Sequence, residues 1–167
     1  VFRESALLQS IFIGMTNLIF TMLGMVVIDK FGRKNLLYIG SVFMTIALLS
    51  VAAGFKYESL GGYYMLFSLM LYIAAFAMSL GAVIWVLISE VFPTSVRAKG
   101  QVFGSMTHWA WCAILTWVFP TLVESGLSVP TFCFFAIMAA LTFVFALKLP
   151  VTKNKSLEEI QKELTSQ

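Results

Sequence analysis

Charged side chains are scarce in this sequence. Asp, Glu, Lys and Arg make up only 11% of its 167 residues, whereas a soluble domain carries about 25%. Hydrophobic residues account for 60% of the chain. This deficit of charge excludes a soluble domain and predicts an integral membrane protein. The net charge of +3 is small, so the composition gives no reason to expect a nucleic acid as a partner.

Residues that build metal sites and disulfides are also few. The chain has one histidine and two cysteines, and Cys112 and Cys133 both lie in apolar stretches where they are predicted to be small packing residues. His108 has neither a second histidine nor an intramembrane carboxylate to accompany it, so we expect no metal site. A Ser–His–Asp arrangement and a phosphate-binding glycine loop are both missing. The sequence therefore predicts neither an enzyme nor a bound cofactor.

Long apolar runs dominate the rest of the chain. A transmembrane helix needs about 20 mostly apolar residues, and five segments meet this length without Asp, Glu, Lys or Arg in their interior. We therefore expect an all-α membrane protein with residues 1–149 in the membrane part and residues 150–167 as a cytoplasmic tail with one short amphipathic helix. The predicted spans are 6–28, 36–55, 63–88, 102–119 and 131–149.

The basic residues alternate between the two sides of these spans. The loops 29–35 and 89–101, together with the tail from Lys148, hold nine of the eleven Lys and Arg residues. By the positive-inside rule these segments face the cytoplasm, which predicts a multi-pass protein of the inner (plasma) membrane with a cytoplasmic C-terminus and an external Val1. No signal peptide precedes this external start. We therefore expect the chain to be the C-terminal part of a larger transporter or channel.

Three polar or aromatic positions within the spans suggest a binding site. An unsatisfied amide in hydrocarbon costs several kcal/mol, so Asn17 is expected to bind either a polar solute or a neighbouring helix. Trp85 follows Gly81 by one turn, and its flat ring with one N–H donor suits either the C–H face of a sugar or ordinary packing. His108 is expected to bind solute, to titrate near neutral pH, or to bond a neighbouring helix.

Charged residues at the cytoplasmic helix ends suggest a second feature. Arg33, Glu90 and Arg97 are predicted to face the same compartment. One carboxylate between two guanidinium groups can tie three helices together, because bidentate arginine pairs are directional. The alternative is a set of solvated charges, each worth under about 1 kcal/mol. The sequence leaves these two interpretations open.

Three motifs in order resemble a known family. Residues 29–34 read DKFGRK, which is similar to a loop signature of the major facilitator superfamily. Trp85, followed by SEVFP at 89–93 and RAKG at 97–100, resembles the sugar porter branch. PVTK and then SLEE within 150–159 resemble the C-terminal signature of that branch. The resemblance covers nearly the whole chain and is nearest to bacterial proton-coupled pentose porters of the xylose type.

The resemblance implies a twelve-helix fold of two six-helix bundles, of which these five spans are helices eight to twelve and residues 1–149 a partial C-terminal bundle. It implies alternating access in a lipid bilayer, with a pentose or hexose as substrate, a proton as possible co-substrate and the missing N-terminal helices as partners. The chain alone is not expected to transport. The alternatives are a non-transporting membrane fragment or assembly partner, and a facilitator of an organic ion, which should carry a charged residue in a span.

The resemblance also assigns roles to single residues. His108 stands where the family usually has Gln or Asn, and Ala82 stands where Pro commonly follows Gly. The charge network that favours the outward-facing state is implied for Asp29, Arg33, Glu90 and Arg97. The implied sugar-binding or site-lining residues are Asn17, Phe76, Gly81, Trp85, His108 and Trp109.

Overall fold

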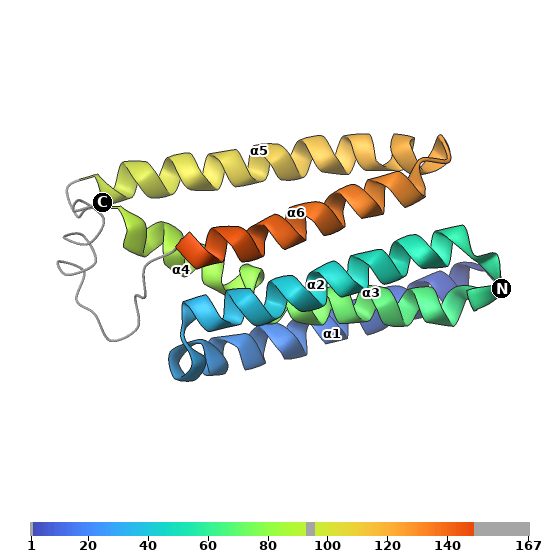
Figure 1. The fold of residues 1–167 in the computed structure, drawn as a ribbon, viewed down its shortest axis with the longest axis horizontal. Helices are drawn as coiled ribbons and strands as arrows, with labels where there is room; N and C mark the ends of the chain where they lie inside the picture. The colour runs from blue at the N-terminus through green and yellow to red at the C-terminus, as the bar shows by residue number, and fades with distance from the viewer. Residues whose placement is uncertain (1, 93–95, 149–167) are drawn as a thin grey trace.

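The computed structural model describes residues 2–92 and 96–148, and this part of the chain is helical throughout (Figure 1). The third and fourth helices together form one span, so the described part contains five candidate membrane spans, which confirms the predicted number and the all-α class. The predicted tail helix lies outside the described residues. The elements are α1 (Phe2–Phe31), α2 (Arg33–Lys56), η1 (Glu58–Leu60), α3 (Gly61–Met78), α4 (Leu80–Val91), α5 (Arg97–Glu124) and α6 (Ser128–Lys148).

Glycine and proline mark the helix connections. Gly32 separates α1 from α2 with φ = 82°, and Gly126 lies between α5 and α6 with φ = 75°. Glycine adopts this left-handed region without steric cost, so the chain can reverse within one or two residues. Pro130 is the third residue of α6, where no intrahelical N–H bond is lost. Pro120 lies inside α5, which continues past it to Glu124.

The best-packed interface joins α2 to α6. Small side chains at Ala136 and Ala139 let the two helices approach closely, which is how membrane helices gain packing energy. Near the C-terminal end of α6, Ala146 is also fully buried, in a second cluster with Leu36 and Leu37 of α2. The buried cluster at this interface consists of Met44, Leu48, Val51, Ala52, Phe132, Ala136 and Ala139.

A hydroxyl cluster ties α2 to α3. Ser50 Oγ donates to the Tyr64 hydroxyl at 2.7 Å, and it lies 2.9 Å from Ser68 Oγ. Ser68 Oγ also lies 2.9 Å from the backbone carbonyl of Tyr64, to which it donates. Interhelical hydrogen bonds of this kind are worth about 0.6–2 kcal/mol in a membrane. The cluster therefore fixes the register of α3 against α2.

The fifth helix stands apart from this body. None of its residues, Arg97–Glu124, is buried, and it packs only against α4 near its start and α6 near its end. Figure 1 shows α5 running along one edge of the molecule, roughly parallel to α6. The side of α5 that faces α2 and α3 is therefore open, and this opening is where the candidate site lies.

Candidate functional site

The third span is broken at Ser79. Its backbone has φ = −113° and ψ = −96°, and its side-chain Oγ donates to the carbonyl of Ala75 at 2.6 Å. A serine hydroxyl that bonds the carbonyl four residues earlier can bend a helix. The same bond at Thr16 and Thr107 leaves α1 and α5 unbroken, so at Ser79 it accompanies the break and does not by itself cause it. Figure 1 shows α4 leaving the line of α3 and running toward the start of α5. The break precedes Gly81, so the bend forms without a proline at Ala82.

Two glycines from neighbouring helices close on this break. A methyl group at Gly40 of α2 would overlap Oγ and Cβ of Ser79. A methyl group at Gly24 of α1 would lie 3.1 Å from Cα of Met78. The contact at Gly40 is too short for any side chain, and the one at Gly24 would require Met78 to shift by a few tenths of an ångström, so glycine allows α1 and α2 to approach the break this closely. This break, which we call the Ser79 hinge, is therefore packed against α1 on one side and α2 on the other.

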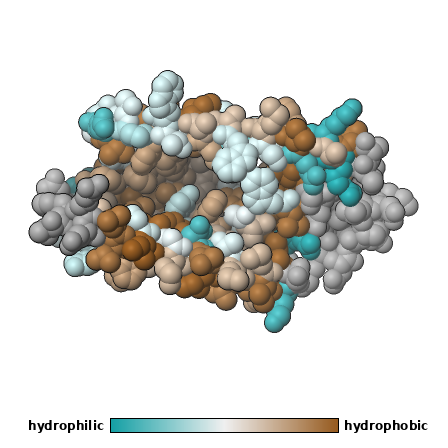
Figure 2. Space-filling view, turned by 180° about the vertical axis from the view of Figure 1, so that it is seen from behind, coloured by the Kyte–Doolittle hydropathy of each residue, from teal (hydrophilic) through white to brown (hydrophobic). Residues whose placement is uncertain are grey.

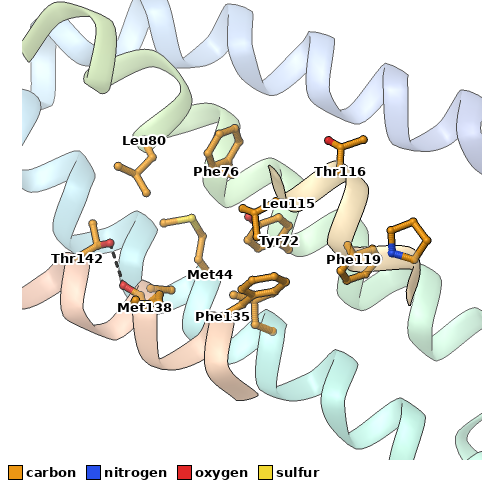
Figure 3. A pocket seen from close by; sticks show the side chains of 13 residues that line it. Met44, Tyr72, Phe76, Leu80, Leu115, Thr116, Phe119, Phe135, Met138 and Thr142 are labelled. Atoms are coloured by element: carbon orange, nitrogen blue, oxygen red, sulfur yellow. Dashed lines mark hydrogen bonds between the residues drawn. The ribbon is translucent and has the colours of Figure 1, made fainter. Parts of the chain in front are cut away.

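The predicted site residues Phe76 and Gly81 come together at the hinge. A methyl group at Gly81 would lie 3.1 Å from the carbonyl oxygen of Phe76 and 3.4 Å from Cε1 of its ring. Figure 3 shows the Phe76 ring pointing into the cavity described below. Glycine at position 81 thus makes room for this ring beside the bend.

The predicted residues Trp85 and His108 meet where α4 packs on α5. Their ring centroids lie 5.2 Å apart in an edge-to-face arrangement with an angle of 75°. Residues three or four apart share a helix face, so the contact repeats along both helices in a series that we call the α4–α5 seam. The seam consists of the pairs Trp85–His108, Ile88–Gly104 and Phe92–Gly100.

Glycine on α5 makes the seam possible. A methyl group at Gly104 would lie 3.3 Å from Cγ2 of Ile88, and one at Gly100 would overlap the ring of Phe92. Small residues spaced by four let membrane helices approach closely. The seam therefore sets the depth and direction of Trp85 and His108, because their helices are locked one and two turns away.

His108 lies in an aromatic and polar cluster. The ring of Trp109 is 5.6 Å from it, at an angle of 78°, and the Sγ atom of Cys112 is 3.6 Å from its Nε2. Trp85 is 42% exposed and Trp109 is 64% exposed, so both indole rings keep surface that a solute can contact. The cluster offers ring faces together with one imidazole, which is the combination that a polar ring-shaped molecule requires.

A cavity of about 670 Å³ lies further along α5, and its lining includes Phe76 but neither Trp85 nor His108. Figure 3 shows side chains from α2, α3, α4, α5 and α6 around it, and Figure 2 shows a hollow with largely hydrophobic walls. The volume is in the range of ligand pockets, about 300–1,000 Å³. The lining residues are Met44, Leu48, Tyr72, Phe76, Leu80, Leu115, Thr116, Phe119, Pro120, Phe135, Met138, Ala139 and Thr142.

Polar side chains in this cavity are few: the Tyr72 hydroxyl and two threonines that already donate hydrogen bonds. Thr116 Oγ1 donates to the carbonyl of Cys112 at 2.7 Å, and Thr142 Oγ1 donates to the carbonyl of Met138 at 3.1 Å. Sequence reasoning missed most of the lining residues, Thr116 among them. The available signal was spacing, since Cys112 and Thr116 follow His108 by four and eight residues on one helical face.

Asn17 lies on α1, a helix that makes no described contact with α5. It is exposed on α1, and the hydrogen bond described for it comes from Thr21 Oγ1, at 3.4 Å, to its own Oδ1. Helix α1 packs against α3 and α4 rather than α5. Among the contacts described for residues 2–92 and 96–148, none joins Asn17 to Trp85 or His108. Its role as a sugar ligand stays a prediction.

The predicted charge network lies at one end of the molecule. Arg33 begins α2 and Arg97 begins α5, and these two helix ends lie on the same side in Figure 1. Arg97 Nε donates to the carbonyl of Phe92 at 3.4 Å, next to the end of α4. The side chains of Asp29 and Glu90 are outside the described part, so their pairing with the two arginines stays a prediction.

Comparison with protein families agrees with this geometry. The profile of the family described as "Sugar (and other) transporter" matches residues 1–164. The chain belongs to this sugar transporter family. It is therefore part of a transporter family rather than an enzyme family, and it is a multi-pass membrane protein like its bacterial relatives.

Individual relatives include two bacterial symporters. The D-xylose-proton symporter of Escherichia coli (strain K12) is 39% identical over 165 residues, which is 95% of this chain and 33% of the relative. The arabinose-proton symporter of Bacillus subtilis (strain 168) is 34% identical over 161 residues, which is 96% of this chain and 35% of the relative. The chain thus spans about a third of the length of the curated relatives it matches.

Solved structures show the same partial match. The proton:xylose symporter XylE bound to 6-bromo-6-deoxy-D-glucose superposes with a TM-score of 0.86 at 38% identity, covering 96% of this chain and 35% of that chain. The inward open conformation of XylE from E. coli gives 0.87 at 38% identity, covering 95% and 36%. The five spans therefore have the fold of part of a major facilitator superfamily transporter.

Proposed function

We propose that this chain forms one wall of the sugar pathway in a transporter that moves a pentose or hexose by alternating access, with a proton as co-substrate. The observation that carries the proposal is the aromatic cluster at the α4–α5 seam, in which Trp85 and His108 lie 5.2 Å apart. The symporters of xylose and arabinose among the relatives support a pentose and a proton.

The chemistry of the cluster suits one face of a sugar. Trp85 provides a ring for the C–H face, and neutral His108 can donate one hydrogen bond and accept another. The neutral imidazole can therefore take the hydrogen-bonding role of the Gln or Asn side chain that the family usually has at position 108. Trp109 extends the aromatic surface, and Phe76 with Gly81 forms the boundary at the hinge. Asn17 contributes from α1 only if the solute or another helix reaches that side.

The remaining sugar hydroxyls need partners from elsewhere. The cavity beyond the cluster is apolar, and the hydroxyls of Thr116 and Thr142 already donate to helix carbonyls. A sugar buried there would find few partners beyond the Tyr72 hydroxyl and the threonine lone pairs, so most of its own hydroxyls would be unsatisfied, at about 1–3 kcal/mol each. Transport is therefore expected only when further helices complete the site. We place the end with Arg33 and Arg97 in the cytoplasm of a cell whose inner membrane holds the protein.

The decisive experiment is uptake by the full-length gene product in proteoliposomes. A panel of labelled pentoses and hexoses is offered with and without an inward proton gradient. We expect uptake of at least one sugar, accelerated by the gradient. An uptake rate that is the same with and without the gradient would remove the proton from the proposal. If the folded protein takes up none of the sugars, the proposed function is wrong.

The same assay tests the aromatic cluster. Replacing Trp85 by Ala removes the stacking ring, and we expect sugar uptake to fall by about tenfold or more, since buried aromatic anchors commonly carry 2 kcal/mol or more of binding energy. Trp117→Ala is the matched control, because Trp117 lies on α5 and is 86% exposed. Equal uptake by the two variants would remove Trp85 from the site.

A further inference from the structure

His108 and Cys112 form a pair of metal-ligating side chains on one face of α5. They are one helical turn apart, both are half-buried, and Nε2 of His108 lies 3.6 Å from Sγ of Cys112. Two ligands four residues apart on a helix are the arrangement that zinc peptidases use with histidine. Cys133, the other cysteine, packs against the α2–α6 cluster and has no histidine beside it.

The measured separation matches the geometry of a tetrahedral metal. Zinc binds thiolate sulfur at about 2.3 Å and imidazole nitrogen at about 2.0–2.1 Å, and a tetrahedral angle between these bonds places the two atoms about 3.6 Å apart. The side chains are therefore already at the required spacing. Binding does not require α5 to bend or either ligand to change its helical position.

We propose that His108 and Cys112 bind a zinc ion at the α4–α5 seam. In this step the S–H bond of Cys112 breaks and its proton goes to solvent, while the thiolate sulfur forms a bond to Zn²⁺. Neutral His108 supplies the lone pair of Nε2 for the second bond. Two water molecules complete the tetrahedral coordination. No oxidant or reductant is involved.

The site is an exchangeable one rather than a structural one. The described part of the chain contains no group of three or more His, Cys, Asp and Glu side chains that could hold a metal. Structural zinc sites use four protein ligands, so a two-ligand site binds more weakly and releases its ion more readily. The sequence predicted no metal site because only a second histidine and a carboxylate were considered as partners for His108.

Zinc at this position would also obstruct the aromatic cluster. The ring of Trp85 lies 5.2 Å from that of His108, so an ion on Nε2 and its two waters compete for the space and the hydrogen bonds that the imidazole offers to a sugar. This consequence rests on the proposed function, whereas zinc binding itself does not. Zinc should therefore inhibit uptake of whichever sugar is transported.

Binding is tested directly with metal on the purified full-length protein in detergent. Co²⁺ replaces Zn²⁺ as a spectroscopic probe, and Zn²⁺ affinity follows from its competition with Co²⁺. We expect a thiolate-to-cobalt charge-transfer band in the wild-type protein and in Cys133→Ala, and no band in Cys112→Ala. His108→Gln should keep the fold and, because it removes a direct ligand, weaken metal affinity by more than the roughly 10-fold that loss of an outer hydrogen-bond partner of a ligand commonly costs.

Each result decides the proposal. A band that persists in Cys112→Ala, or one that disappears in Cys133→Ala, would assign the metal to a different place. A wild-type protein without a band at millimolar Co²⁺ would overturn the site altogether. Zinc inhibition of uptake in wild-type protein but not in Cys112→Ala would support the competition with sugar. If the protein transports none of the offered sugars, the cobalt spectrum still decides whether the metal site exists.

Discussion

Gly100→Ala is the sharpest test of the α4–α5 seam. Gly100 faces Phe92, and a methyl group there would overlap its ring, with Cδ1 only 2.6 Å away. The optimal separation of non-bonded carbon atoms is about 3.5–4.0 Å, so the two side chains must move apart by about 1 Å. Because α5 has no buried residue to hold it in place, we expect the helix to move away from α4.

The magnitude follows from overpacking and from a matched control. Extra methyl groups in packed interiors cost about 1–3 kcal/mol, but alanine also gains about 1 kcal/mol of helix propensity over glycine. Gly62→Ala isolates the propensity term, since Gly62 lies in the first turn of α3 and a methyl group there would meet nothing within 4 Å. We expect Gly100→Ala to be less stable than Gly62→Ala by about 1–3 kcal/mol.

The measurement is the free energy of unfolding of the full-length protein in mixed micelles, followed by tryptophan fluorescence. A double-mutant cycle with Phe92→Ala separates the steric overlap from other effects. Truncating Phe92 should destabilise the wild type but cost less in the Gly100→Ala background, because the overlap is then relieved. Equal costs in both backgrounds, or equal stability of Gly100→Ala and Gly62→Ala, would refute the seam.

Two further predictions concern the hinge and the charged end. Gly40→Ala should lower the free energy of unfolding by about 1–3 kcal/mol, because the methyl group overlaps Ser79; a stability equal to that of Gly62→Ala would show that the hinge is not packed as described. Glu90→Ala should shift the protein toward the inward-open state while leaving sugar affinity intact, as measured by site-directed labelling of the pathway and by sugar binding. Lost binding with unchanged labelling would contradict the predicted charge network.

The five spans were predictable because each depends on a local property. Twenty apolar residues in sequence suffice to cross a membrane, whatever the neighbouring helices do. The aromatic site was partly predictable for a similar reason, since an intramembrane tryptophan and histidine stand out by residue type alone. The family motifs at 29–34 and 89–100 then indicated the sugar transporter family, and the family profile confirmed that membership. The sugar-binding roles of Trp85 and His108 stay predictions.

The remaining features depend on contacts between helices. Gly100 belonged to a recognised motif, but the sequence does not tell which face of α4 it meets, and the overlap with Phe92 appears only once both helices are placed. Asn17 was predicted from its type and depth, yet its direction depends on how α1 packs. The break at Ser79 was missed because a serine inside an apolar helix usually bonds its own turn without ending it.

The Ser79 hinge is a bend that the backbone of the third span can reverse. Proline bends a helix permanently, because its missing N–H and its ring clash cannot be restored, at about 3 kcal/mol or more. At Ser79 the bend is accompanied by an ordinary hydroxyl bond to Ala75, worth about 0.5–1.5 kcal/mol, and every backbone N–H needed for a straight helix is still present. The half of the span that carries Trp85 can therefore change its angle to the half that carries Phe76 and return, provided that the close contacts of Gly24 and Gly40 with the hinge are released.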